Sequence, residues 1–196
     1  MSLTACGNGA GRDVRAVPTF PSAPSSGAAA AKVRGTLLPN DCADVLSGVG
    51  MSALLGQPVD SIRSKAVVGV SAPAVGMLER VTCLYRRTSN RGGPTDVELH
   101  LSAYADADAA GRHTAINIRA ERANSRTVEE LAIGSAPAVL LGETGQLVLI
   151  VTNGRSAVSL TMREGVLPGD QARPVMLDLA QRVLPNLAPE PALEPR

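Results

Sequence analysis

The stretch QLVLIVTNGRSAVSLTM, residues 146–162, decides the fold. Two runs rich in apolar and β-branched residues flank the dipeptide Asn153-Gly154, which favours a two-residue turn of type I′ between antiparallel strands. Pairing about this turn places Leu149 opposite Val158 and fixes which side chains share a face of the sheet. The residues that we expect to face the core are Leu147, Leu149, Val158 and Leu160.

The other face of this hairpin carries Val148 and Ile150, opposite the small residues Ser159 and Ala157. Small side chains that face away from the core can form the floor of an apolar ligand groove. The alternative is that another helix simply covers this face, and the sequence leaves both interpretations open.

The rest of the chain alternates strand and helix patterns around this hairpin. Period-two patterns predict further strands over residues 62–70, 77–87, 97–102, 127–133 and, more briefly, 139–141. Two short helices follow a cap at Asn40 or Asp41, and a longer helix follows a cap at Asp106 or Asp108. We therefore predict an α+β fold, with an antiparallel sheet of about six strands packed against helices.

Two of the predicted helices have apolar stripes that we expect to face the core. The stripe of the helix after residue 106 is Ala109, His113, Ile116, Ala120 and Ala123. The last helix begins at a cap on Asp170, and its stripe is Val175, Met176, Leu179, Ala180 and Val183.

The two ends of the chain differ in composition from its middle. Residues 7–38 are rich in Pro, Ser, Ala and Gly, and several prolines interrupt residues 188–196. Such segments bury too little apolar surface to offset the entropy of ordering them. We interpret residues 1–38 as a lipobox remnant with a disordered tether, residues 39–187 as a single domain, and residues 188–196 as a disordered tail.

The lipobox is the segment Leu3-Thr4-Ala5-Cys6, which has an aliphatic residue, two small residues and a cysteine. In bacterial lipoproteins the thiol at this position receives a diacylglycerol, so Cys6 is the predicted lipidation site. The alternative is a chance match in a disordered tail. A lipid on Cys6 would place the protein on the extracytoplasmic side of the cell membrane.

The two remaining cysteines, Cys42 and Cys83, form an even pair. Outside the cytoplasm two such cysteines usually bridge, whereas in the cytosol they would be buried free thiols. The sequence has no Cys-x-x-Cys motif and no histidine pair at ligand spacing, so we expect no metal site.

Composition excludes some classes of function. The 19 Lys+Arg and 18 Asp+Glu residues give a net charge of +1, without the basic excess that is typical of nucleic-acid binders. The chain has one Phe, two Tyr and no Trp, which leaves little aromatic surface for stacking bases or sugars. The sequence contains no run of 18 apolar residues, so it predicts no transmembrane helix.

Motifs for catalysis are equally scarce. No Gly-x-Ser-x-Gly elbow occurs, and the Gly-x-Gly-x-x-Ala match at residues 48–53 follows a helix rather than a strand. His100 lies on the polar side of a strand and His113 in a helical stripe, with no nucleophile or orienting acid recognisable near either in the sequence. We therefore predict no catalytic residues and no cofactor.

Short motifs in a fixed order carry a family resemblance. They are Asp41-Cys42, Leu54-Leu55-Gly56, Thr82-Cys83-Leu84-Tyr85, a Gly134-Ser135-Ala136 turn before Leu147-Val148-Leu149, and a closing helix with Leu179, Ala180, Val183 and Leu184. This order resembles the small secreted lipoproteins of actinobacteria described as LpqN-like, although the turn is one residue shorter and Tyr85 replaces a common Trp. The resemblance implies a PsbP-like sandwich and a Cys42–Cys83 disulfide.

Two hypotheses of function follow. The first is a non-enzymatic, lipid-anchored envelope domain that acts as an interaction or accessory module for an envelope protein. The second is an extracytoplasmic carrier or sensor of an apolar small molecule or lipid, held in a groove over Val148, Ile150, Ala157 and Ser159. A hydrolase is a third and less supported class, because a fold never excludes a site grafted on it.

Overall fold

The computed structural model describes residues 37–90 and 92–187. Cys6, the predicted tether and the predicted tail lie outside the described residues. The strands are β1 (Ile62–Val68), β2 (Met77–Arg87), β3 (Val97–Tyr104), β4 (Thr127–Ile133), β5 (Ala136–Glu143), β6 (Gln146–Asn153) and β7 (Ser156–Arg163). The helices are α1 (Cys42–Val45), α2 (Gly48–Leu54), α3 (Ala107–Arg122) and α4 (Gly169–Val183), with short 3₁₀ turns η1 (Pro73–Val75) and η2 (Leu184–Asn186).

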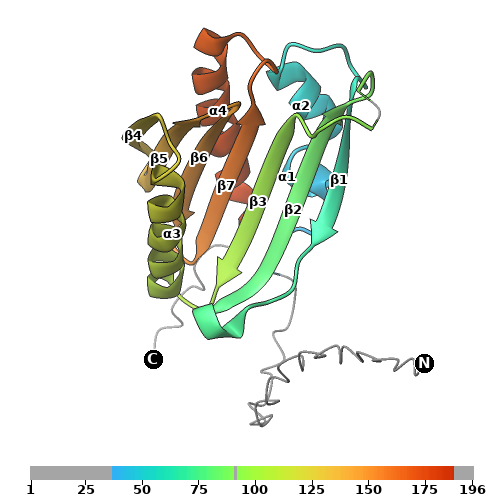
Figure 1. The fold of residues 1–196 in the computed structure, drawn as a ribbon. Helices are drawn as coiled ribbons and strands as arrows, with labels where there is room; N and C mark the ends of the chain where they lie inside the picture. Colours follow the sequence, from blue (N-terminus) through green and yellow to red (C-terminus); the bar gives the residue numbers. More distant parts are fainter. Residues whose placement is uncertain (1–36, 91, 188–196) are drawn as a thin grey trace, which may run out of the picture. The chain divides into compact units, whose positions relative to one another are not determined.

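The strands form one antiparallel sheet in the order β1-β2-β3-β7-β6-β5-β4 (Figure 1). This confirms the predicted α+β fold of an antiparallel sheet packed against helices. The sheet has seven strands rather than about six, because the segment after the turn at Gly134 forms the full strand β5 instead of a short extended piece.

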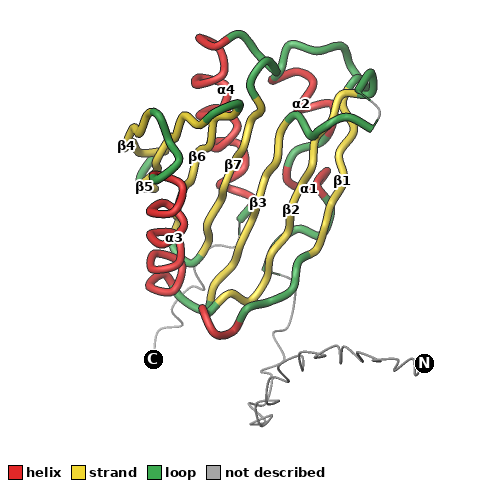
Figure 2. The backbone as a smooth tube through the Cα atoms, viewed as in Figure 1, coloured by secondary structure: helices red, strands yellow, loops and turns green. Residues whose placement is uncertain are grey.

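The helices divide between the two faces of the sheet. Helices α1, α2 and α4 lie behind the sheet in the view of Figures 1 and 2, and α3 lies in front of it, over the half that contains β5 and β6. We call the face under α1, α2 and α4 the inner face, and the face that carries α3 the outer face. The outer face of β1, β2 and β3 has no helix over it in this view.

The main core lies between the inner face and the three helices behind it. Alternate residues of β2, β3 and β7 point into this core, as the period-two patterns predict. On α4 the buried residues are Met176, Leu179, Ala180 and Val183. Val175 is only partly buried, and Asp170 lies in the first turn without capping the helix, which begins after Pro168 with no side-chain cap.

The short N-terminal helix α1 is fixed to the sheet by a disulfide and a tyrosine. Cys42 and Cys83 are bonded, with their Cα atoms 5.5 Å apart, and both are fully buried. This is the pairing that the family resemblance implies. The Tyr85 hydroxyl donates a hydrogen bond to the Leu46 carbonyl at 2.8 Å. Burial, with a smaller effect of the Asp41 carboxylate, raises the pKa of Tyr85 well above its usual value.

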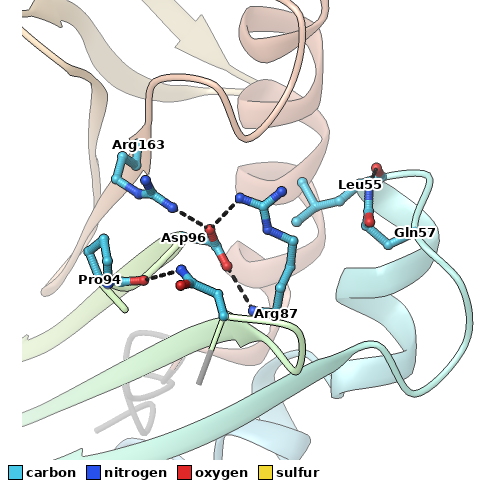
Figure 3. Close-up of polar contacts among 7 residues, drawn as sticks. Leu55, Gln57, Arg87, Pro94, Asp96 and Arg163 are labelled. Atoms are coloured by element: carbon cyan, nitrogen blue, oxygen red, sulfur yellow. Dashed lines mark hydrogen bonds and ion pairs between the residues drawn. The ribbon is translucent and has the colours of Figure 1, made fainter. Parts of the chain in front are cut away.

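An ionic cluster closes the end of the sheet where β2, β3 and β7 meet (Figure 3). Asp96 is 1% exposed and accepts hydrogen bonds from the Arg87 backbone N–H at 2.7 Å and from the guanidinium groups of Arg87 at 2.9 Å and Arg163 at 2.7 Å. Burial alone would raise the pKa of Asp96, but these hydrogen bonds outweigh it and lower the pKa. Asp96 therefore remains ionised and holds the start of β3 against β2 and β7.

The hairpin between β6 and β7 differs from the predicted one in register. Leu149 pairs with Leu160 and Val151 with Val158, so the strands are shifted by two residues while each side chain keeps its predicted face. The loop is Gly154-Arg155, and Asn153 belongs to the strand. Gly154 has φ +53° and Arg155 does not have positive φ, which fits a type II′ turn rather than the predicted type I′.

Helix α3 also differs from the prediction. Its cap is Asp106, which accepts from the Ala109 N–H at 2.7 Å, but Ile116 is 62% exposed. The buried residues are Ala109, Ala110 and Thr114, so the side facing the sheet is rotated from the predicted stripe. The side of α3 that faces the sheet covers apolar side chains and also carries polar residues that line a groove. Apolar spacing alone therefore does not identify this side of the helix.

Candidate binding groove

A groove of about 390 Å³ lies between α3 and the outer face of the sheet. Its lining comes from η1, β2, β3, α3, β6 and β7. The predicted groove residues Val148, Ile150, Ala157 and Ser159 all lie in this lining. Its volume is within the range of pockets that hold small molecules.

The floor of the groove is apolar and divided in two. Val148 and Ile150 are buried with Val139 and Leu141 in a small cluster that Ile118 of α3 covers. Ala157 and Ser159 are only partly buried. The helix therefore covers one half of the predicted apolar face, and the groove continues over the other half.

A close approach of the backbone positions α3 beside η1. A Cβ atom on Gly76 would lie 2.8 Å from the Cβ of Ala109, and Gly76 has φ +74°, a conformation that L residues rarely adopt. The Gly76 carbonyl accepts a hydrogen bond from the Ala105 N–H at 2.8 Å, just before the helix begins. Gly76 thus allows the start of α3 to pack against the turn that precedes β2.

One polar wall of the groove contains Tyr104 of β3 and His113 of α3. The Tyr104 hydroxyl lies 2.8 Å from Nδ1 of His113, and the Asn117 side-chain amide lies 3.4 Å from the same nitrogen. Burial raises the pKa of Tyr104, against smaller opposing effects of Ser102 and Arg80. The phenol is therefore protonated at neutral pH and donates to Nδ1 when that nitrogen carries no proton.

A second histidine lies on the open side of the groove, on β3. Nδ1 of His100 is 2.9 Å from the Thr82 hydroxyl and 3.5 Å from the Arg80 guanidinium, and Nε2 is 3.4 Å from the Glu98 carboxylate. Burial and the nearby Arg80 charge lower the pKa of His100, while Glu98 opposes them. His100 is therefore a neutral imidazole at neutral pH, next to a positive charge.

Among the described residues that line the groove, Thr114 has a buried side-chain oxygen without a hydrogen-bond partner. Thr114 lines the groove and is 4% exposed, and its Oγ1 makes no hydrogen bond within the described part of the chain. A buried hydroxyl without a partner is costly, so it is a natural contact for a polar group of a ligand.

The far end of the groove is acidic. Glu121 and Gln146 line it, and Gln146 donates to the Glu143 carboxylate at 2.6 Å. Burial, together with a hydrogen bond and charge repulsion from Glu143, raises the pKa of Glu121. The groove thus runs from a cationic end at Arg80 to an acidic end at Glu121.

Sequence reasoning found the apolar floor but missed the polar wall. The sequence patterns did not identify four of the polar groove residues, which are Arg80, Tyr104, Thr114 and Glu121. The spacing of polar residues on α3 could have indicated part of this wall. His113, Asn117 and Glu121 are spaced four residues apart, which places them on one side of a helix. His100 and His113 are both hydrogen-bonded, and their partners are a threonine and a tyrosine hydroxyl.

Comparison with known proteins gives no family. No family model matches the chain, and no curated protein matches it. Among solved structures, the extracellular domain of PknH from Mycobacterium tuberculosis is similar, with a TM-score of 0.47 and 12% identity over 76% of this chain and 93% of that one. This likeness is too distant to define a family, so what the groove can bind follows from its own residues. None of the described helices is both long and apolar enough to span a bilayer.

Proposed function

We propose that this chain is a non-enzymatic binding domain, lipid-anchored through Cys6 on the outer side of the membrane, which holds a small amphipathic molecule in the groove under α3. The observation that carries the proposal is the pairing of an apolar floor with hydrogen-bonding side chains around one hollow. Pockets for small molecules combine these two features, with apolar walls for affinity and a few polar groups for orientation.

The two ends of the groove indicate how such a molecule would lie. An anionic or acceptor group fits beside Arg80, and a hydrogen-bonding group fits at the unpartnered Thr114 hydroxyl. The apolar part would rest on Ala157, next to the part of the floor that α3 covers. This favours an amphipathic ligand over the wholly apolar one that the hairpin sequence alone suggested.

The disulfide supports the extracytoplasmic part of the proposal. Bonds such as Cys42–Cys83 persist outside the cytoplasm and are rare within it. The lipid on Cys6 is supported by the sequence pattern alone, because Cys6 lies outside the described residues. Intact mass of protein from a host with lipoprotein processing tests it, and an unmodified Cys6 would contradict the anchor while leaving the groove proposal in place.

A probe experiment tests the groove. We expect anilinonaphthalene sulfonate, an amphipathic anion, to bind the full chain saturably with a rise in fluorescence. Ala157→Leu adds a branched side chain where the groove is open and should weaken this binding on the order of tenfold, because it fills the space that the probe needs. Equal binding by wild type and variant would contradict the proposal.

The matched control is Ala120→Leu, which makes the same change on an exposed position of α3 outside the groove lining. It should leave probe binding unchanged. Lipid extraction from the purified chain, followed by mass spectrometry, then identifies a natural ligand: a species enriched on wild type and lost from Ala157→Leu is expected.

The role as an accessory module for an envelope protein is the other hypothesis, and it needs a different measurement. A partner enriched on wild type in an envelope pull-down, and retained on Ala157→Leu, would favour protein binding outside the groove. A partner lost with Ala157→Leu would instead place that protein's contact at the groove.

A further inference from the structure

The outer face of β1 and β2 concentrates positive charge. Arg63 and Lys65 point outward from β1, and Arg86 is directly opposite Arg63 in the strand pairing. Together with Leu84 and Thr88 they line a shallow hollow of about 590 Å³. None of these three cations forms an ion pair within the described residues.

This arrangement is unfavourable for the isolated domain. Like charges directly opposite each other across a strand pair are destabilising. On the outer face of β1, β2 and β3, as far as the structure describes them, Glu98 is the one acidic side chain, and it lies beside His100 rather than beside the cations. The Glu79 carboxylate binds the backbone N–H groups of Leu37 and Leu38 instead. Within the described residues, the three cations of this face therefore have no acidic partner.

Two exposed apolar side chains, Val67 and Val75, lie on the same face, and a third, Val70, lies in the loop after β1. Val67 follows Lys65 on the outer face of β1, and Val70 in the next loop is 87% exposed. Val75 of η1 is exposed as well, and it also lines the mouth of the groove. We call Arg63, Lys65, Arg86, Val67, Val70 and Val75 the β1 strip.

We propose that the β1 strip docks on an anionic membrane surface. Basic residues next to exposed apolar residues are what a lipid interface attracts, because the cations meet the headgroups and the apolar groups meet the acyl boundary. The three β1 residues of the strip run from Arg63 to Val67, which is about 13 Å at the rise of a strand. That length exceeds the size of a single phosphate group.

Docking in this way would bring the groove next to the bilayer. Val75 belongs both to the strip and to the groove lining, and Arg80 lies at the same open side. An amphipathic ligand could then enter from the lipid. The docking itself rests on the strip alone, so it stands or falls independently of the proposed groove ligand.

Vesicle sedimentation tests the docking. The full chain, with Cys6→Ser in every protein so that no lipid is attached, is mixed with vesicles of phosphatidylcholine alone or of phosphatidylcholine with a quarter phosphatidylglycerol. We expect binding to the anionic vesicles only, and a decrease as salt is added. The double variant Arg63→Gln/Lys65→Gln should lower the partition coefficient about tenfold or more, since each cation near an anionic surface contributes to binding.

The control removes the same charge from the opposite face. Arg173→Gln/Arg182→Gln changes two exposed arginines of α4 and should keep binding within about twofold of wild type, because α4 lies away from the strip. Absence of binding to anionic vesicles, or an equal loss in both double variants, would overturn the proposal. If free glycerol phosphate at low concentration displaced the protein from the vesicles, the strip would be a site for a small anion, and the docking proposal would be overturned. Thermal unfolding midpoints of both double variants that equal the wild-type midpoint show that the fold is kept.

Discussion

The phenol oxygen of Tyr104 lies 2.8 Å from Nδ1 of His113, and this contact joins β3 to α3 across the loop of the Asp106 cap. The two rings are tilted at 44° with centroids 5.5 Å apart. The buried residues of α3 are Ala109, Ala110 and Thr114, so this hydrogen bond is one of the few directional contacts that the helix makes with the strands. The groove therefore depends for its shape on a polar pair that also lines it.

Removing the phenol oxygen should loosen α3. We expect Tyr104→Phe to lower the free energy of unfolding by about 1 kcal/mol, the usual value of a hydrogen bond between neutral groups. A double-mutant cycle with His113→Ala, measured by urea unfolding, isolates the pair. A coupling energy of about 1 kcal/mol is expected. If the two changes were simply additive, the contact would contribute nothing.

The Asp96 cluster predicts a dependence of stability on pH. The pKa of Asp96 is lower in the folded protein than in the unfolded chain. Its ionised form therefore stabilises the fold at pH values above the unfolded pKa of about 3.9, and this contribution is lost as the pH falls through the lower folded pKa.

The change Asp96→Asn should cost about 3 kcal/mol at neutral pH, because it leaves the two guanidinium groups at 2.7 and 2.9 Å without their carboxylate. Denaturant unfolding from neutral to acidic pH should show wild type losing more stability than the variant. Glu129→Gln is the control, since its partner Arg173 is exposed and the pair should contribute little. Parallel curves for Asp96→Asn and wild type would show that Asp96 is not the titrating group.

The disulfide gives a third expectation. Cys42 and Cys83 are 41 residues apart, and closing a loop of that length stabilises a fold by about 4 kcal/mol in the chain-entropy model. The paired change Cys42→Ala/Cys83→Ala should lower the denaturation midpoint accordingly, and reductant should do the same to wild type. Cys6→Ser should leave the midpoint unchanged. An unaltered midpoint after complete reduction would mean that the bridge does not stabilise the domain.

Much of the fold is predictable because period-two patterns are local. Val81, Cys83 and Tyr85 recur at every second position of β2, and the structure buries all three on the inner face. The faces of the β6–β7 hairpin were also predicted correctly, since a shift of two residues returns each side chain to the same side. Burial pattern therefore fixes the face of a strand, even where it does not fix the register.

The polar wall of the groove was not predictable in the same way. Thr82 and His100 are brought together by the β2–β3 pairing, and Tyr104 and His113 by the angle at which α3 leaves the strand. Neither relation is a periodicity of one segment. The predicted stripe of α3 was wrong at Ile116, which is exposed. Apolar spacing alone cannot identify the side of a helix that faces the sheet when that side also lines a polar groove.

The turn between β6 and β7 offers the sharpest test of the register. Gly154 has φ +53°, so Gly154→Ala forces an L side chain into the left-handed region and should cost about 1–2 kcal/mol. Asn153 pairs with Ser156 in the ladder, so Asn153→Thr should be tolerated within about 0.5 kcal/mol, since β-branched residues suit a strand. In a type I′ turn centred on Asn153-Gly154 both positions would need positive φ, and Asn153→Thr would then be costly as well. Urea unfolding of the two variants separates these registers, and a similar loss of stability in both would reject the pairing of Leu149 with Leu160.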